Sequence, residues 1–405
     1  MPSQEEKRKR VRNLRNFLTQ MNAYHPPKKK RRNDRNFLKR LPQRDEDLES
    51  TLLECYIMAR RGKRRTADEH KFEVYLEENL SQLAHDIINR QWKPSRSKAF
   101  VTHTPVDREI FAAQFRDRIV HHLLYAVVAP WWDKRFIYDS YSCRAEKGTD
   151  FGISRMQSFM RKASENGKNK AYVLKGDLSG YFMSLDRKRL YEKVMWGLKK
   201  QFPNGGWLYR LCKYLWREVI FDEPCFGARI VGSFKDWECL PYNKTLFHQP
   251  DGRGIVIGNL TSQLLSNIML NDFDWYVKKK LGFAFYGRYV DDFFIVVPEK
   301  ELTRAKKAFF NEIPLKLSSM ELTMHPKKIY IQEVKKGCPF LGKVVRPFVL
   351  TPGRRYLKNM KIALNAYVDG KTGFDTAKSY IGMSRNMSAY LVIDKTIEQI
   401  ESRIG

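Results

Sequence analysis

Regularly spaced apolar residues predict helices in the first third of the chain. Between residues 45 and 90, Leu48 and Leu52 begin a pattern that recurs at helical spacing on an otherwise polar background. Pro94 interrupts this pattern, because proline restricts the residue before it to extended backbone. We expect an extended stretch over 99–104 and a further helix from Asp117 to Pro130.

The middle of the chain contains apolar, strand-like runs that end in carboxylates. Residues 171–176 (AYVLKG) lead into Asp177, and FAFYGRYV and FFIVV flank the pair Asp291 and Asp292. Two such runs around a short polar pair predict a β-hairpin whose turn carries the acids. If the strand before Asp177 pairs beside this hairpin, the three carboxylates come together.

The remaining segments are assigned more coarsely. Residues 201–250 are rich in Gly, Pro and Trp, and we expect an irregular insertion on the surface. Apolar periodicity predicts a helix over 261–281 and another over 302–313. Strands are expected around 329 and over 340–345, followed by a basic helical tail over 356–404.

The net charge narrows the choice of partner. The 405 residues include 75 Lys plus Arg and 45 Asp plus Glu, a formal net charge of +30, so a polyanion such as nucleic acid is expected. An anionic membrane is the rival, but no stretch approaches the ~18 apolar residues of a membrane span. We therefore expect a cytoplasmic protein without membrane partners.

The six cysteines form no CxxC pair, which argues against a zinc knuckle or a disulfide framework.

The first 44 residues carry many more basic than acidic residues, and we expect a mobile basic arm there. The basic block in this arm has three possible roles. It could contact nucleic-acid phosphates, act as a nuclear-import signal or be a solvated tail. That block consists of Lys28, Lys29, Lys30, Arg31 and Arg32.

Three converging carboxylates suit a specific chemistry. Carboxylate oxygens are the ligands that Mg²⁺ prefers, and two such ions about 4 Å apart activate a hydroxyl for attack on a phosphate. Taken alone, Asp291 and Asp292 are better explained as an ordinary polar turn, because such pairs are common in hairpins. Asp177 and the motifs around it favour the metal site.

The order of these motifs resembles a reverse transcriptase from about residue 90 to residue 390. The matching parts are the strand ending at Asp177, Gly258 opening a helix, the box Tyr289-Val290-Asp291-Asp292, Lys328, and Phe340-Leu341-Gly342. The resemblance implies an α+β right-hand polymerase fold with fingers, an antiparallel palm sheet with packed helices, and a helical thumb. The implied division is 1–44 basic arm, 45–170 helical region and fingers, 171–345 palm with the 201–250 insertion, and 346–405 thumb.

One box narrows the resemblance. Ile257-Gly258-Asn259-Leu260-Thr261-Ser262-Gln263 departs from the Gln-Gly-x-x-x-Ser-Pro pattern of group II intron and retroviral enzymes. It is similar to the Ile-Gly-x-x-x-Ser-Gln box of diversity-generating retroelement reverse transcriptases. The stretches FRDRIVHH, SYSCRAEKGTD and GRYVDDFFIVV strengthen the resemblance to that family. In that family the box accompanies error-prone copying of template adenines, which implies mutagenic retrohoming by a bacterial or phage-encoded enzyme.

The resemblance also implies residue roles. The two Mg²⁺ ions, or Mn²⁺ in their place, would be held by Asp177, the backbone carbonyl of Leu178, Asp291 and Asp292. Lys328 would donate a proton to the leaving pyrophosphate, although the adjacent Lys327 leaves the register open. The incoming dNTP would meet Arg108, Phe182, Ile257 and Gln263; the primer grip would be Phe340, Leu341 and Gly342; and Lys358, Lys361 and Arg385 would touch duplex phosphates.

Simpler roles exist for several of these residues. Phe182 and Phe340 are also explained by core packing, and Arg108 by a surface ion pair. Four functions stay open at this point. They are a retroelement polymerase, an antiphage-defence reverse transcriptase acting with a non-coding RNA, an idle RNA-binding scaffold and a two-metal nuclease. The implied partners are a structured template RNA, cDNA in an RNA–DNA hybrid, dNTPs and a small basic accessory variability protein.

Overall fold

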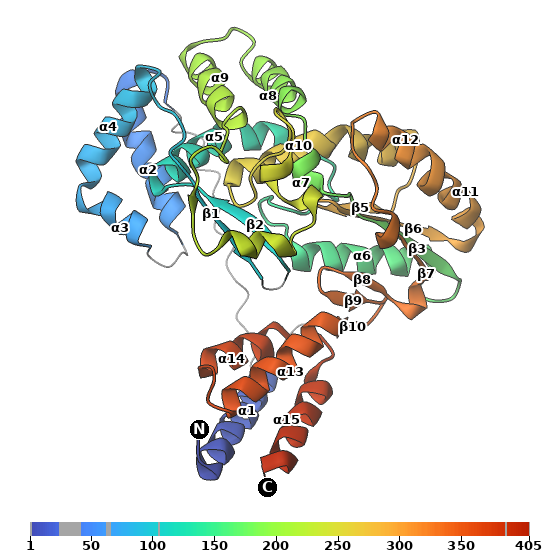
Figure 1. Ribbon diagram of the computed structural model, residues 1–405. Helices are drawn as coiled ribbons and strands as arrows, with labels where there is room; N and C mark the ends of the chain where they lie inside the picture. The colour runs from blue at the N-terminus through green and yellow to red at the C-terminus, as the bar shows by residue number, and fades with distance from the viewer. Residues whose placement is uncertain (1, 24–41, 62–65, 104–105, 385–386, 405) are drawn as a thin grey trace.

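The protein has an α+β fold, seen in a computed structural model that describes residues 2–23, 42–61, 66–103, 106–384 and 387–404 (Figure 1). The expected fold class is confirmed, since helices pack on largely antiparallel sheets. The α-helices are α1 Gln4–Ala23, α2 Leu48–Arg60, α3 Ala67–Val74, α4 Leu76–Ile88, α5 Phe115–Asp133, α6 Thr149–Ala163, α7 Tyr181–Ser184, α8 Arg187–Gln201, α9 Trp207–Ile220, α10 Leu260–Trp275, α11 Leu302–Lys307, α12 Ile313–Ser318, α13 Arg354–Val368, α14 Phe374–Met383 and α15 Tyr390–Ile404. The strands are β1 Lys98–Thr102, β2 Arg108–Ala112, β3 Ala171–Gly176, β4 Arg229–Ile230, β5 Tyr286–Tyr289, β6 Asp292–Pro298, β7 Tyr330–Glu333, β8 Cys338–Phe340, β9 Lys343–Val345 and β10 Leu350–Pro352.

A four-stranded antiparallel sheet in the order β5-β6-β3-β7 forms the centre of the main body. Residues of β6 alternate between two cores, with Phe293, Ile295 and Val297 on one side and Phe294 and Val296 on the other, against α6. This alternation is the period of two that a strand buried on both faces requires. Because helices cover both faces, a polar site on this sheet has to lie where strands end.

Part of the segment 201–250 belongs to the main core, so the expected surface insertion is wrong for its first half. Helix α9 buries Leu211, Leu215 and Trp216 in the core that also contains residues of α8 and α4. The Gly and Pro residues on either side of α9 obscured its helical period. The rest of the segment has no long helix or strand. It contains β4, which pairs with β1 in the sheet β2-β1-β4, and short 3₁₀-helices such as Phe234–Cys239.

Glu109 ties this irregular segment to the β1–β2 hairpin. Its side chain is buried, and it accepts hydrogen bonds from Trp237 Nε1 (2.8 Å), Thr245 Oγ1 (2.7 Å) and the Leu246 backbone N–H (2.6 Å). A buried carboxylate is stable only when its oxygens are satisfied in this way. The hairpin and the irregular segment are therefore held together.

Helices α5 and α10 end differently from the prediction. Helix α5 runs through Pro130 to Asp133. Proline removes one backbone donor, but buried Trp132 anchors the last turn of the helix. Helix α10 ends at Trp275, and a π-helix over Tyr276–Lys280 completes the segment expected as one helix.

The C-terminal helices form a separate unit that includes the start of the chain. Val11, Leu14 and Leu18 of α1 are buried in one core with residues of α13, α14 and α15. The mobile arm expected over 1–44 is therefore wrong for Gln4–Ala23, which is a helix because its apolar residues recur every three to four positions. Both labelled chain ends lie in this unit (Figure 1).

No helix in the described part of the chain is long and apolar enough to cross a membrane.

We predict that Leu14→Ala loosens the C-terminal unit. Leu14 is 0% exposed, and truncating a buried leucine costs about 2–5 kcal/mol. Hydrogen exchange of α13 and α15 amides should accelerate, while amides of β3 and β6 stay protected. The control is Asn16→Ala, which changes an exposed residue of the same helix. Equal exchange in both variants would contradict the packing of α1 against these helices.

Candidate active site at the edge of the central sheet

The structure brings Asp177, Asp291 and Asp292 to one edge of the central sheet. Asp177 follows β3 directly, and β3 pairs with β6 so that Gly176 lies opposite Phe293. Asp292 opens β6 opposite Tyr289, and Asp291 lies in the turn before it. Strand pairing therefore gathers residues more than 100 positions apart.

Two lysines face these carboxylates. Lys328 Nζ lies 2.7 Å from Asp177 Oδ1, and Lys175 Nζ lies 3.1 Å from Asp292 Oδ1. Lys327 is exposed, and its backbone N–H donates to His325 Nδ1. Of the two adjacent lysines, it is thus Lys328 whose amine reaches the site.

The site concentrates negative charge. Burial raises the pKa of Asp291 to about 6, and the charges of Asp177 and Asp292 add to the effect. Burial also raises the pKa of Asp292, although Lys175 opposes this. Three carboxylates with two ammonium groups form a site that a cation would stabilise.

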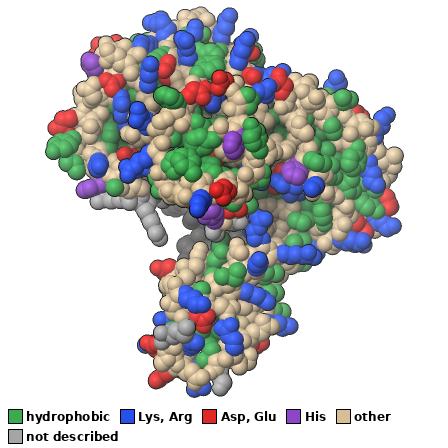
Figure 2. Space-filling view, viewed as in Figure 1, with side chains coloured by type: hydrophobic (Ala, Val, Ile, Leu, Met, Phe, Trp, Pro, Cys, Tyr) green, Lys and Arg blue, Asp and Glu red, His purple; other side chains and the backbone are tan. Residues whose placement is uncertain are grey.

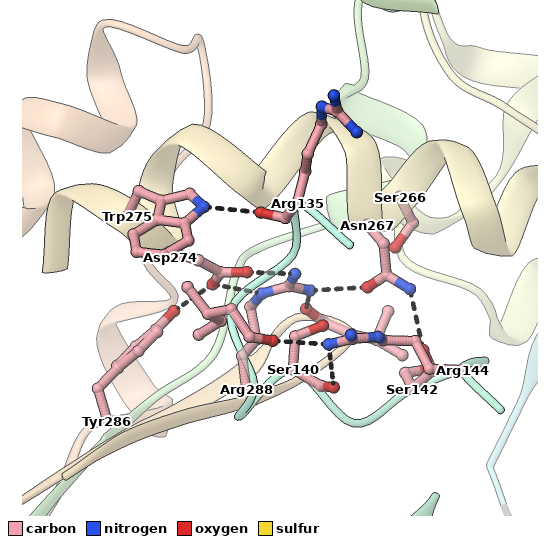
Figure 3. A network of polar contacts seen from close by, with 12 residues as sticks. Arg135, Ser140, Ser142, Arg144, Ser266, Asn267, Asp274, Trp275, Tyr286 and Arg288 are labelled. Atoms are coloured by element: carbon pink, nitrogen blue, oxygen red, sulfur yellow. Dashed lines mark hydrogen bonds and ion pairs between the residues drawn. The ribbon is translucent and has the colours of Figure 1, made fainter. Parts of the chain in front are cut away.

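A buried ion pair holds the turn that carries Asp291 (Figure 3). Arg288 donates from Nε and Nη2 to the two carboxylate oxygens of Asp274, both at 2.7 Å, and from Nη1 to the Val290 carbonyl at 2.7 Å. Asn267 Oδ1 and the Tyr286 hydroxyl complete the network, the latter donating to Asp274 at 2.6 Å. Burial alone would lower the pKa of Arg288, but Asp274 overrides it and the net shift is upward.

Val290 adopts a strained backbone conformation, which explains why its carbonyl is held by Arg288. Its φ is 56°, in the left-handed region that β-branched residues rarely adopt. Such a residue costs about 1–3 kcal/mol and persists only where its surroundings fix it. The bond from Arg288 to its carbonyl supplies that restraint, and Asp291 follows directly.

The box Ile257–Gln263 lies between β2 and α5. Thr261 Oγ1 is 2.9 Å from Nδ1 of buried His121, whose pKa burial lowers to about 3. A neutral imidazole therefore anchors the box. A cavity of about 270 Å³ opens beside it, lined by residues of β2 and α5 and by Gly258, Asn259 and Leu260.

The residues expected to meet the nucleotide are spread around this region. Ile257 is half-buried against a cluster containing Phe111, and Gln263 is half-buried in the first turn of α10; neither lines the cavity. Phe182 is half-buried on α7 against the main core. Arg108 is exposed at the start of β2.

The expected primer grip is a hairpin of β8 and β9. Phe340 is buried and packs edge-on to Phe294, with ring centroids 5.1 Å apart. Leu341 and Gly342 form the turn, both with positive φ. Phe340 thus packs in the core, which is the simpler role considered for it. The backbone groups of Leu341 and Gly342 are what this turn could present to a primer.

The expected phosphate contacts are only partly described. Lys358 and Lys361 are exposed on α13. Arg385 and the block Lys28, Lys29, Lys30, Arg31 and Arg32 lie outside the described residues.

Leu178 follows Asp177 and forms a backbone bridge to Met324. The hydrogen bonds of its bridge to Met324 run through its neighbours, from Ser179 N–H to Thr323 O and from His325 N–H to Asp177 O. Its own carbonyl takes no part in that pairing.

A second group of potential metal ligands lies elsewhere. His103, Asp107 and Cys239 place their ligand atoms within 4.8 Å of one another, at the β1–β2 hairpin and the end of the 3₁₀-helix Phe234–Cys239. Among the described residues, the ligand atoms of Asp177, Asp291 and Asp292 do not all lie within that distance of one another. Two of the three carboxylates pair with Lys328 and Lys175.

Sequence reasoning missed Lys175, Asp274 and Arg288. Lys175 and Arg288 each stand as a lone charge within an apolar strand, which is a usable signal for a buried ion pair. The partner of Arg288 is in α10 and could not be identified from the pattern.

No family model matches the chain. Protein YkfC of Escherichia coli (strain K12) is 26% identical over 259 residues, which cover 56% of this chain and 60% of that protein. Telomerase of Candida albicans, solved with a TWJ fragment of telomeric RNA, aligns with a TM-score of 0.44 and 12% identity over 78% of this chain and 65% of that chain. Apo telomerase of Candida tropicalis aligns with a TM-score of 0.44 and 10% identity over 100% of this chain and 93% of that chain. The chain thus spans less than two thirds of YkfC and of the Candida albicans telomerase.

We predict that Arg288→Met destabilises the main body by about 3–5 kcal/mol, because it leaves the Asp274 carboxylate buried and unpaired. The double variant Arg288→Met/Asp274→Leu should recover much of this loss, since it removes both charges. Urea unfolding followed by tryptophan fluorescence measures both changes. A double variant no more stable than the single one would show that the ion pair is not the cause.

Proposed function

We propose that this protein is an RNA-directed DNA polymerase with its active site at Asp177, Asp291 and Asp292. The observation that carries the proposal is the convergence of three carboxylates, from the end of β3 and the β5–β6 turn, beside Lys328 and Lys175. The Tyr-Val-Asp-Asp box at the turn and the net charge of +30 support a nucleic-acid substrate.

The residues present suit divalent cations. Asp177, Asp291 and Asp292 with the Leu178 carbonyl would hold two Mg²⁺ or Mn²⁺ ions, as hard oxygen ligands do. When bound, such ions activate the 3′-hydroxyl of a primer and offset the charge of the leaving pyrophosphate. Lys328, whose amine pairs with Asp177, would give a proton to that leaving group.

Other parts of the fold would hold the substrates. Phe182, five residues after Asp177, would exclude a ribose 2′-hydroxyl by bulk, and exposed Arg108 would bind the triphosphate. The turn Leu341-Gly342 would contact the primer, and α13 would contact the hybrid through Lys358 and Lys361. The main body and the C-terminal unit then act as palm with fingers and as thumb.

The first test is primer extension by the full chain on an RNA template with dNTPs and Mg²⁺. We predict cDNA synthesis by the parent and none by Asp291→Asn, with RNA affinity unchanged within about twofold, because the substitution removes one metal ligand only. Synthesis by the variant would refute the proposed site. Binding without synthesis by the parent would favour an RNA-binding scaffold, and cleavage of the template would favour a nuclease.

A second prediction separates the two neighbouring lysines. Lys328→Ala should slow nucleotide addition by about 100-fold, the usual effect of losing a general acid. Lys327→Ala should leave the rate near that of the parent, since the ion pair with Asp177 is made by Lys328. Single-turnover kinetics measures both, and equal rates for the two variants would remove Lys328 from the reaction.

We further propose the diversity-generating subtype, with a structured template RNA and a small basic accessory protein as partners. Ile257 cannot hydrogen-bond to a base pair, which weakens discrimination against mispairs. Sequencing the cDNA should show errors concentrated opposite template adenines, and Ile257→Gln should reduce them. An even spread of errors in the parent would exclude this subtype while leaving polymerase activity intact.

A further inference from the structure

Helix α1 presents an exposed basic face. Arg8, Lys9 and Arg12 are all exposed, and at 3.6 residues per turn they fall on one side of the helix. Glu5 lies on the same side one turn earlier. The opposite side carries Val11, Leu14 and Leu18, which are buried in the C-terminal unit.

The other basic residues of α1 are occupied in holding it to that unit. Arg10 donates to the Tyr367 carbonyl at 2.8 Å, Arg15 pairs with Glu401 at 2.5 Å, and Lys7 lies 3.9 Å from Asp369. The side chains of Arg8, Lys9 and Arg12 have no ion-pair or hydrogen-bond partner in the part of the chain that the structure describes. Their charges are thus available to a ligand.

The unit that carries this face is joined to the candidate active site through β8–β10. The Gly353 N–H donates to the Gly342 carbonyl at 3.0 Å, and the Ser388 N–H donates to the Leu350 carbonyl at 2.8 Å. Figure 2 shows Lys and Arg side chains, with some Asp and Glu among them, on the visible face of the C-terminal unit. A polymer leaving the β8–β9 turn would therefore meet the C-terminal unit next.

We propose that Arg8, Lys9 and Arg12 bind the phosphate backbone of a nucleic-acid duplex, so that the first helix of the chain extends the duplex-binding surface of the C-terminal unit. The inference rests on the proposed function for the nature of the partner. An anionic membrane is a weaker candidate, because membrane-surface helices insert an apolar face and that of α1 is already buried. Binding to phosphates in this way is independent of sequence.

The test compares Arg8→Ala/Lys9→Ala/Arg12→Ala with the parent, both as full chains, by fluorescence anisotropy. The probes are two RNA–DNA hybrids of unrelated sequence, titrated over a range of salt concentrations. We expect the variant to bind both hybrids about tenfold more weakly, and the slope of log affinity against log salt to fall by about one unit for each phosphate that is no longer neutralised. Alanine favours helix, so α1 should persist, and circular dichroism checks this.

The matched control is Lys199→Ala/Lys200→Ala/Lys213→Ala, which removes three exposed charges from α8 and α9 at the far end of the molecule (Figure 1). It should leave the salt slope unchanged. Equal binding by the parent and the α1 variant, or an equal loss of affinity in both variants, would overturn the inference. Phosphatidylserine vesicles are titrated in parallel, and a loss of affinity confined to these vesicles would also overturn the inference. A parent that binds hybrids without extending a primer would refute the polymerase and not this surface.

Discussion

Arg288 and Asp274 form an ion pair whose side chains are 1% and 0% exposed, and the geometry of the candidate active site depends on it. A single charge at this depth would cost several kcal/mol, so each residue requires the other. The guanidinium has donors left after binding Asp274, and one of them reaches the Val290 carbonyl. A hydrophobic pair of the same volume would stabilise the core equally well, but it could not hold that carbonyl.

The turn fixed in this way holds Asp291 close to the carboxylates of Asp177 and Asp292. Three carboxylates lie at the end of adjacent strands and repel one another. Burial raises the pKa of Asp291 to about 6, and the charges of Asp177 and Asp292 add to the rise. Lys328 and Lys175 relieve part of the repulsion, each through one carboxylate. An ion entering the site would compete with the Lys328 amine for Asp177, which couples metal binding to the position of the proposed proton donor.

The strands of this arrangement and the convergence of their terminal acids could be predicted from sequence, and the contacts between helices and the sheet could not. The hairpin around Asp291 and the strand before Asp177 follow from apolar runs that end in acids, and their antiparallel pairing accounts for the shared edge. The pairing of Arg288 with Asp274 depends on how α10 crosses the sheet, which no local pattern encodes. Helix α9 was missed because the Gly and Pro residues around it dominate the composition. The charge of α1 conceals the apolar spacing of Val11, Leu14 and Leu18, so its composition predicts an arm. The partners of these residues lie more than 340 residues away.

The central claim is that this edge of the sheet binds divalent ions and the reacting phosphates. The most direct measurement is a structure of the full chain with an RNA template, a chain-terminated DNA primer, a dNTP and Mg²⁺. The account predicts ions held by Asp177 and Asp291, with the Lys328 amine moved from Asp177 toward the β- and γ-phosphates of the nucleotide. Nucleic acid bound away from the β5–β6 turn, with Lys328 still paired to Asp177, would contradict it.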